Sequence, residues 1–421
     1  MNFARLTGCF LLLSSWGLVS AQDRTTVVTV IPEPQLKADL DPLLDFAAFW
    51  KSTPESFEKL YQPRVEKQEN NPQFEWLTAA KDRARFSRHM FSNTDTHLSL
   101  FRDSVKVEEA IVEFVNGRAA RTTISIYNRG DSGQISLQEF DRIFRKIGQN
   151  LGTMTKVAPR RQVVSGNAAV KMVSWVWSTP AGIALLEHND FQNGGQVGKP
   201  EFLRLKLAAP DQADWSMGKM SMGVQRMALL KNVTKTAEGD VFISGVPMVD
   251  QGAKGYCVAA SCQRLFEYMR IPCDQHEMAQ ILSVDVERGA NAIMMQKSLA
   301  KLDQKFGVTF KPFINPEIYY DSRGKRKVSI KEFSGIIKEH ADKGVPLLWA
   351  LELGRFPEDP PLPNAGQISG GHMRMMIGYN ATSNLVIFTD SWGAGHELKR
   401  MSVADASEVT LGLYSMSPRG M

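Results

Sequence analysis

The segment Val246–Ser261 constrains this chain of 421 residues more than any other segment. A β-rich run leads into a glycine-containing loop, and an apolar, helix-like stretch then begins at Cys257. A thiol in the first turn of a helix faces unpaired amides and the positive end of the macrodipole, which favours the thiolate. Gly252 and Gly255 allow the loop to turn tightly and a ligand to approach the backbone. The segment therefore predicts a reactive cysteine at a strand–loop–helix junction.

Gln251 lies six residues before Cys257. Its side-chain amide could donate a hydrogen bond to a developing oxyanion, together with the backbone N–H of the cysteine. A nucleophilic thiol also requires a general base. His372 is the best candidate, because it follows a Ser-Gly-Gly turn and opens an apolar strand that would hold the ring rigidly.

A second β-rich run, residues 385–389, leads directly to Asp390. If this run pairs in antiparallel fashion with the strand that begins at His372, the Asp390 carboxylate comes close to the imidazole. It could then accept a hydrogen bond and fix the tautomer of the ring. The other histidines after the cysteine lie on a helix surface, at a helix end or in a loop: His276, His340 and His396.

The order of these four residues resembles that of papain-like cysteine peptidases: Gln251, Cys257, His372 and Asp390. In that superfamily an Asn or Asp followed by Ser-Trp-Gly completes the site, as at Asp390 here. The cysteine segment also resembles the bacterial branch typified by bacteriocin-leader-processing peptidases. The resemblance covers about residues 241–415 and implies catalysis by Cys257 and His372. It further implies orientation of the histidine by Asp390 and oxyanion stabilisation by Gln251.

The sequence departs from the plant and lysosomal pattern around the nucleophile. Val258 stands where those enzymes have tryptophan, and the cysteine they carry upstream of the nucleophile is absent. The disulfide formed by that upstream cysteine is therefore not expected. The transporter portions that accompany many leader-processing peptidases are also missing, so a preference for Gly-Gly sites is not implied.

A chain of this length is expected to hold two or three domains. Residues 22–94 are predicted to form a helical lead-in. Residues 95–210 combine hairpin signals with an amphipathic helix, which predicts an α+β accessory domain or pro-domain with an antiparallel sheet. A linker is expected at 211–240. From 241 to 421 helices precede strands, the order of a papain-like domain, so the whole chain is predicted to be α+β.

The first 21 residues have the pattern of a secretory signal peptide. Arg5 supplies the positive end, a short apolar stretch follows, and Val19-Ser20-Ala21 forms a small-residue cleavage site. No later segment reaches about 18 uninterrupted apolar residues, so we expect a periplasmic or secreted protein without a membrane span. The net charge of +5 includes no dense basic run, and no nucleic-acid partner is expected.

Removal of the signal peptide leaves Cys257, Cys262 and Cys273. Because three cysteines cannot all pair internally, at least one thiol is expected to stay reduced. Cys262 and Cys273 could pair, or all three could be small buried hydrophobes. The histidines and cysteines lack zinc-ligand spacing, and the calcium-loop-like segment 128–139 has Gly130 at a ligand position. We therefore expect no metal ion and no cofactor.

Three functions are compatible with these residues. The first is an exported cysteine peptidase that cleaves a peptide or protein substrate through a thioacyl intermediate. The second is an acyltransferase or peptidoglycan amidase that uses the same chemistry. The third is an inactive binding protein on the same scaffold, which intact Cys257, His372 and Asp390 disfavour. The sequence favours the peptidase and indicates neither its cleavage preference nor its oligomeric state.

Overall fold

A computed structural model describes most of the chain from residue 37 onwards. The described residues are 37–61, 73–88, 96–164, 172–191, 198–216, 224, 226–252, 256–271, 273, 275–282, 299–300, 302–303, 306–315, 328–362 and 368–418. The predicted signal peptide lies outside them. Among the described helices, none combines the length and the apolar character needed to cross a bilayer.

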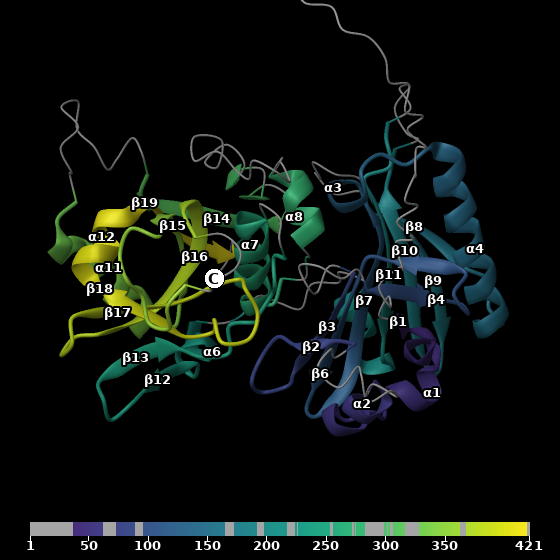
Figure 1. Cartoon of the computed structure of the whole chain (residues 1–421), viewed down its shortest axis with the longest axis horizontal. Coiled ribbons are helices and arrows are strands. Elements are labelled where there is room, and N and C mark those ends of the chain that lie inside the picture. The colour runs from purple at the N-terminus through teal and green to yellow at the C-terminus, as the bar shows by residue number, and fades with distance from the viewer. Residues whose placement is uncertain are drawn as a thin grey trace, which may run out of the picture. The chain divides into compact units, whose positions relative to one another are not determined.

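The first half of the described chain builds an eight-stranded sheet with the order β2-β3-β6-β7-β11-β10-β9-β8, in which all neighbours are antiparallel (Figure 1). Its strands are β2 (Glu75–Trp76), β3 (Arg83–Ser87), β6 (Glu109–Val115), β7 (Arg118–Asn128), β8 (Arg160–Val164), β9 (Met172–Thr179), β10 (Gly182–Asn189) and β11 (Phe202–Ala208). Helix α4 (Leu137–Thr155) packs on this sheet, and its Ile147 and Leu151 join the same core as Trp177 of β9.

Local sequence explains these elements. Asn116 and Gly117 both have positive φ, 51° and 74°, as a two-residue hairpin turn between β6 and β7 requires. The Ser136 side chain caps the first turn of α4. Gly152 is a residue type typical of helix ends, but the helix runs past it to Thr155 and has Lys156 as its C-cap. Lys156 adopts the left-handed conformation, and its N–H bonds to the carbonyl of Gly152.

Only part of the predicted helical lead-in at 22–94 is helical among its described residues, 37–61 and 73–88. The short helices α1 (Phe46–Phe49) and α2 (Pro54–Leu60) form, but β2 and β3 are strands of the large sheet. The sequence hid β3 because its apolar residues alternate with Arg83 and Arg85. Both arginines are buried, and they pair with Glu113 and Glu109 of the neighbouring strand β6. A further small sheet has the order β1-β4-β5, with β1 (Lys37–Asp39), β4 (His97–Leu100) and β5 (Val105–Val107).

The second half of the chain builds another eight-stranded sheet, with the order β12-β13-β16-β15-β19-β14 and with β17 and β18 attached beside β16. Its strands are β12 (Val233–Lys235), β13 (Asp240–Ile243), β14 (Val308–Ile314), β15 (Leu347–Leu353), β16 (Gly370–Asn380), β17 (Leu385–Thr389), β18 (Lys399–Ser402) and β19 (Thr410–Pro418). Its helices are α6 (Arg226–Leu230), α7 (Cys257–Tyr268), α8 (Gln275–Ile281), α11 (Ile330–Asp342) and α12 (Val403–Val409).

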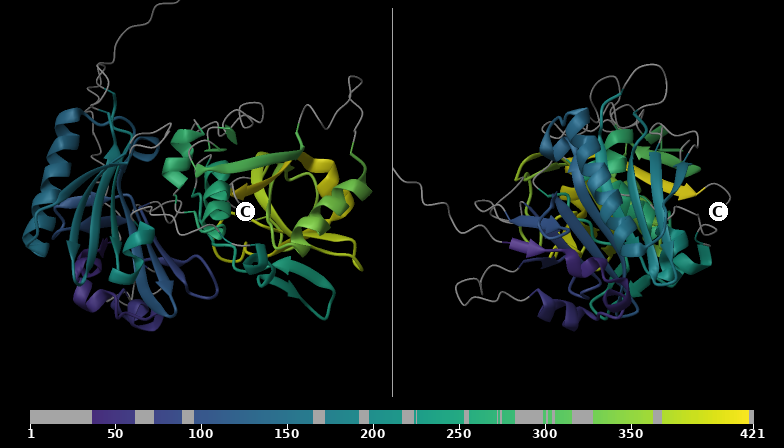
Figure 2. Two further views of the ribbon diagram at one scale, coloured as in Figure 1. Left: turned by 180° about the vertical axis from the view of Figure 1, so that it is seen from behind. Right: turned by 90° about the vertical axis from the view of Figure 1, so that its right-hand side faces the viewer.

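Strand β16 lies between helices on both faces of this sheet. Met373, Met375 and Ile377 share a core with α7, whereas Met376 shares a second core with α11 and α12. Figures 1 and 2 show α7 on one side of β16, with α11 and α12 on the other. Helices α7 and α8 precede most of the antiparallel strands, and the predicted α+β class is confirmed.

Several elements of this half differ from what the sequence favours. Residues 241–249 have a strand-like pattern, but β13 ends at Ile243. Residues 294–306 have a helix-like pattern and lie largely outside the described residues. β12 already pairs with β13 within the stretch predicted to be a linker. β14 and β18 were not predicted, because Pro312 and the charged pair Lys399-Arg400 weaken their strand patterns. The domain boundaries remain predictions.

Candidate active site

Cys257 is the first residue of α7, and 8% of its surface is exposed. The N-cap residue Tyr256 places no side-chain cap on the helix, so the first amides of α7 face the region of the thiol. One turn further, the Ser261 hydroxyl donates to the carbonyl of Met373 at 3.1 Å. This hydrogen bond attaches α7 to β16 at the residue that follows His372, which fixes the cysteine relative to the histidine.

His372 is the third residue of β16 and pairs in register with Leu351 of β15. Its ring is fully buried, and Nε2 donates to Oδ1 of Asp390 at 2.7 Å. Asp390 follows the last residue of β17, where Thr389 pairs with Met375 of β16. Antiparallel pairing of these strands therefore brings the imidazole and the carboxylate together, as their positions in the sequence predicted. Their catalytic roles remain a prediction.

Charge interactions at this pair outweigh its burial. Burial alone would lower the pKa of His372, but the Asp390 carboxylate and the adjacent Cys257 side chain raise that pKa to about 9. Burial alone would raise the pKa of Asp390. His372, Arg374 and the Ser391 amide instead hold the pKa of this carboxyl well below its usual range. The pair is therefore an imidazolium–carboxylate ion pair at neutral pH.

Nδ1, the second ring nitrogen of His372, is available for an interaction with the Cys257 thiol. With Nε2 bound to Asp390, Nδ1 is buried and has no hydrogen bond of good geometry within the described structure. The Trp392 ring stacks on the imidazole with centroids 4.7 Å apart and an interplanar angle of 22°. This indole covers the ion pair and restricts the orientation of the ring.

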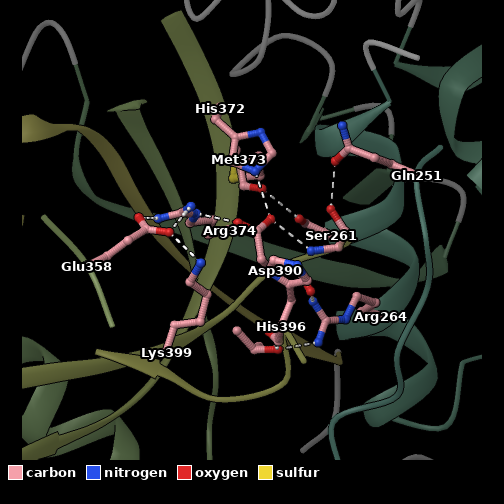
Figure 3. A network of polar contacts seen from close by, with 12 residues as sticks. Gln251, Ser261, Arg264, Glu358, His372, Met373, Arg374, Asp390, His396 and Lys399 are labelled. Atoms are coloured by element: carbon pink, nitrogen blue, oxygen red, sulfur yellow. Dashed lines mark hydrogen bonds and ion pairs between the residues drawn. The ribbon is translucent and has the colours of Figure 1, made fainter. Parts of the chain in front are cut away.

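Gln251 is attached to the segment that carries Asp390. Its backbone N–H donates to the carbonyl of Ser391 at 2.9 Å, and the Ser391 hydroxyl donates to Oε1 of its side chain at 2.8 Å (Figure 3). Only 3% of Gln251 is exposed. Because Oε1 accepts from the serine, the Nε2 end of the amide is oriented as the donor. One loop thus positions both the carboxylate and the predicted oxyanion donor.

The sequence analysis missed Arg264, a buried arginine in α7. Its Nε donates to the carbonyl of Pro247 at 2.7 Å, its Nη1 to the carbonyl of Asp390 at 2.6 Å, and its Nη2 to the hydroxyl of Thr389 at 2.5 Å. Burial lowers the pKa of Arg264 to about 10. The arginine connects helix α7, the chain leading to Gln251 and the segment that carries Asp390.

Three more charged residues that the sequence analysis missed lie behind Asp390. Arg374, on β16, donates from Nε to Oδ2 of Asp390 at 2.6 Å. Its two terminal nitrogens form a fork on Glu358, at 2.6 and 3.0 Å. The Lys399 ammonium lies 2.5 Å from the same glutamate. The available signal was a charge at the centre of a run otherwise composed of methionine and isoleucine.

The remaining histidines and cysteines have other environments. The His396 backbone carbonyl accepts from the N–H of Asp390 at 2.9 Å, and Nδ1 of His340 bonds to a carbonyl within α11 at 2.8 Å. The His276 side chain lies outside the described residues. No disulfide joins Cys262 to Cys273, both of which are described. Burial raises the pKa of the Cys262 thiol to about 12, so this cysteine is inert beside Cys257.

Residues 243–411 match the model of the Peptidase_C39 like family. The match includes the four predicted site residues, and it confirms that this part of the chain resembles papain-like cysteine peptidases. No curated protein matches the chain. Among solved structures, the chain is similar to xylellain, a cysteine protease from Xylella fastidiosa. The identity is 14%, the match covers 47% of this chain and 91% of that chain, and the TM-score is 0.28. A TM-score this low supports no conclusion about fold or activity.

Proposed function

We propose that the protein is a cysteine peptidase that hydrolyses peptide bonds with Cys257 as nucleophile and His372 as its acid and base. The observation that carries the proposal is the buried ion pair of His372 and Asp390 beside the first residue of α7. A buried imidazolium is unfavourable unless an anion compensates its charge. Here its second nitrogen is left for a thiol at a helix N-terminus, where a thiolate is favoured.

In the first half-reaction, the Cys257 thiolate attacks the carbonyl carbon of the scissile bond and forms a C–S bond. The negative charge moves to the carbonyl oxygen, where the Gln251 amide and the backbone N–H of Cys257 donate hydrogen bonds. His372 then transfers its Nδ1 proton to the leaving amine as the C–N bond breaks. The product is a thioester on Cys257 and a free amine.

In the second half-reaction, neutral His372 takes a proton from water at Nδ1, and the resulting hydroxide attacks the thioester carbonyl. The C–S bond breaks, the acid product leaves, and the thiolate–imidazolium pair forms again. Asp390 keeps Nε2 protonated throughout, so Nδ1 remains the nitrogen that exchanges protons. This role requires a carboxylate that stays ionised, in accord with its depressed pKa.

The test is alkylation of the purified protein by iodoacetamide at about pH 6, with the modified cysteine identified by mass spectrometry. Cys273, which is half-buried, serves as the internal reference thiol. We expect Cys257 to react at least about 10-fold faster than Cys273, and His372→Ala to abolish the excess. Hydrolysis of a mixed peptide library should fall by at least about 1,000-fold in the same variant. Equal reactivity of the two thiols in the wild type would exclude the proposal.

We further propose that the enzyme acts outside the reducing cytosol after removal of residues 1–21. The support is the composition of that segment, with Arg5 before an apolar stretch and a small-residue site at Val19–Ala21. Expression of the full chain in a bacterium, followed by fractionation and N-terminal sequencing, tests this. A mature protein that begins at Gln22 is expected in the periplasm or the medium. An uncut chain in the cytosol would contradict export.

A further inference from the structure

His372 and four buried side chains behind it form one line of alternating charge. His372 contacts Asp390, Asp390 contacts Arg374, Arg374 contacts Glu358, and Glu358 contacts Lys399 (Figure 3). Side-chain exposure does not exceed 3% for any of the five. Apart from His372, the line contains two anions and two cations, so its charge is balanced without the thiol.

Asp390 cannot remain ionised at this depth without help. A carboxyl group that is completely removed from water becomes a neutral acid unless a cation or several donors compensate it. A neutral Asp390 would lose much of its attraction for the imidazolium. A superfamily site with asparagine in this position has no such requirement, because an amide carries no charge. The aspartate thus creates a requirement for a cation, and Arg374 supplies it at 2.6 Å.

We propose that Arg374 is a positioning residue of the active site, which keeps Asp390 ionised and fixed so that His372 can hold its proton beside Cys257. This inference rests on the proposed function of the cysteine–histidine pair. Arg374 acts through Asp390 and does not contact the thiol or the substrate. Glu358, which is itself bound by Lys399, holds the far side of the guanidinium, so a carboxylate fixes the arginine on each edge.

The geometry suits an arginine better than a lysine. The guanidinium binds one carboxylate through Nε and forks on another through its two terminal nitrogens, which a single ammonium cannot do. Its plane also lies over Phe388, 4.7 Å from the ring centroid, and over Trp392, at 5.4 Å. Since Trp392 stacks on His372, the arginine supports the imidazole from two directions.

Other charged or titratable groups interact with Asp390 or with its neighbours. All of these groups together determine the pH dependence of the site. They are His372 and Arg374 from β16, Cys257 and Arg264 from α7, and His396, Glu397 and Lys399 from the chain after β17. Arg264 contacts only the backbone carbonyl of Asp390, whereas Arg374 contacts its carboxylate. Arg374 is therefore the cation whose removal acts most directly on the charge of Asp390.

The test is the pH profile of Cys257 alkylation between about pH 4 and pH 9 in the wild type and in Arg374→Met. Loss of the cation raises the pKa of the acids around it, so the acid limb of the profile should move up by about one pH unit. On the acid side of the wild-type limb, the alkylation rate at a given pH should fall roughly 10-fold. In the Asp390→Asn background the same substitution should move the acid limb less than half as far.

Arg400→Met is the matched control. Arg400, on β18 of the same sheet, pairs with Asp240 at 2.6 Å and makes no contact with Asp390. Its removal should leave the alkylation profile unchanged. If Arg374→Met does not fold, Arg374→Lys replaces it, because this variant keeps a cation but loses the fork. We expect Arg374→Lys to keep the acid limb within about 0.3 pH units of the wild type and to lower the maximal rate several-fold.

The outcomes separate the two proposals. If the wild-type Cys257 reacts no faster than Cys273, the proposed function fails and this inference fails with it. If the wild-type thiol is fast and depends on His372, but a folded Arg374→Met keeps the wild-type acid limb, only the inference is overturned. An Arg374→Lys variant with the wild-type maximal rate and acid limb would also overturn it.

Discussion

The two eight-stranded sheets both bury acidic and basic side chains, but they use them differently. In the first sheet, Glu187 of β10 lies opposite Arg204 of β11 and is bound by Arg204 at 2.7 Å and by Lys206 at 3.1 Å. In the second sheet, Asp390 is bound by Arg374 and also by His372, whose imidazole can release and take up a proton. Only the second cluster lies beside a thiol at a helix N-terminus. The first cluster stabilises a sheet, and the second can also move a proton.

The largest expected difference between the clusters is in stability. Glu187→Gln removes the buried carboxylate that Arg204 and Lys206 both bind. This substitution should lower the free energy of unfolding by about 3–5 kcal/mol. The rate of Cys257 alkylation per folded molecule should not change. Urea unfolding followed by circular dichroism measures the first quantity, and alkylation at low urea measures the second.

A loss of thiol reactivity in folded Glu187→Gln would show that the two clusters are coupled, and the contrast between the sheets would then be wrong. Arg355→Met is the control for the stability measurement. Arg355 makes two ion pairs but has 45% side-chain exposure, so its removal should cost less than about 1 kcal/mol.

The contributions of the two clusters to stability should depend on pH in opposite directions. The pKa of His372 is raised from 6.5 to about 9 in the folded protein. Its contribution is therefore fully present below about pH 6.5 and is lost as the pH rises through 9, up to about 3 kcal/mol. The pKa of Glu187 is lowered from 4.5 to about 2, because Lys206 and Arg204 outweigh its burial. Its contribution is present above pH 4.5 and is lost as the pH falls toward 2.

The measurement is urea unfolding at a series of pH values from about 3 to 10, with two variants. His372→Gln should remove the loss of stability between pH 6.5 and 9 and leave the acid side as it was. Glu187→Gln should remove the loss of stability on the acid side and leave the alkaline side as it was. An alkaline slope that persists in His372→Gln would mean that another group titrates there, and the ionised state assigned to His372 would be wrong.

The smallest expected effect concerns Ser391, which orients the Gln251 amide but carries no charge. Ser391→Ala removes the hydrogen bond to Oε1 and lets the amide rotate away from the oxyanion. We expect kcat to fall roughly 10-fold with little change in KM, because the lost contact matters mainly in the transition state. Steady-state kinetics on a peptide found in the library screen measures this. A rise in KM at constant kcat would place the hydrogen bond in ground-state binding instead.

Much of this architecture follows from patterns that a sequence carries locally. The Asn116-Gly117 turn, the Ser136 cap and the strand run before Asp390 each lie within a few residues of the feature they specify. The approach of His372 to Asp390 could be predicted because two adjacent runs of strand residues favour antiparallel pairing.

The charge network could not be predicted, because no local pattern shows which charged side chains are buried together. Glu358 and Lys399 meet only where the chain between β15 and β16 is held to β18 by the bridge of Asp359 and Arg400. The sequence shows Arg374 as a charge within an apolar run, but it does not show which carboxylate compensates that charge. The same limitation hid β3, whose buried arginines find their partners on β6. Buried charge is a tertiary property, and periodicity does not encode it.

His372 and Arg374 are two residues apart on one strand, in a stretch where β16 pairs with β15 without a register shift. Both therefore project from the same side of β16 and reach the two oxygens of one carboxylate. A slip of β16 by one residue would present Gly371 and Met373 to Asp390 and leave this acid without either partner. Such a misfolded chain would lose both ion pairs of the buried Asp390 carboxylate. The Asp390 ion pairs thus favour the correct register of β16. Refolded molecules should therefore be either fully active or unfolded, with no population of weakly active forms.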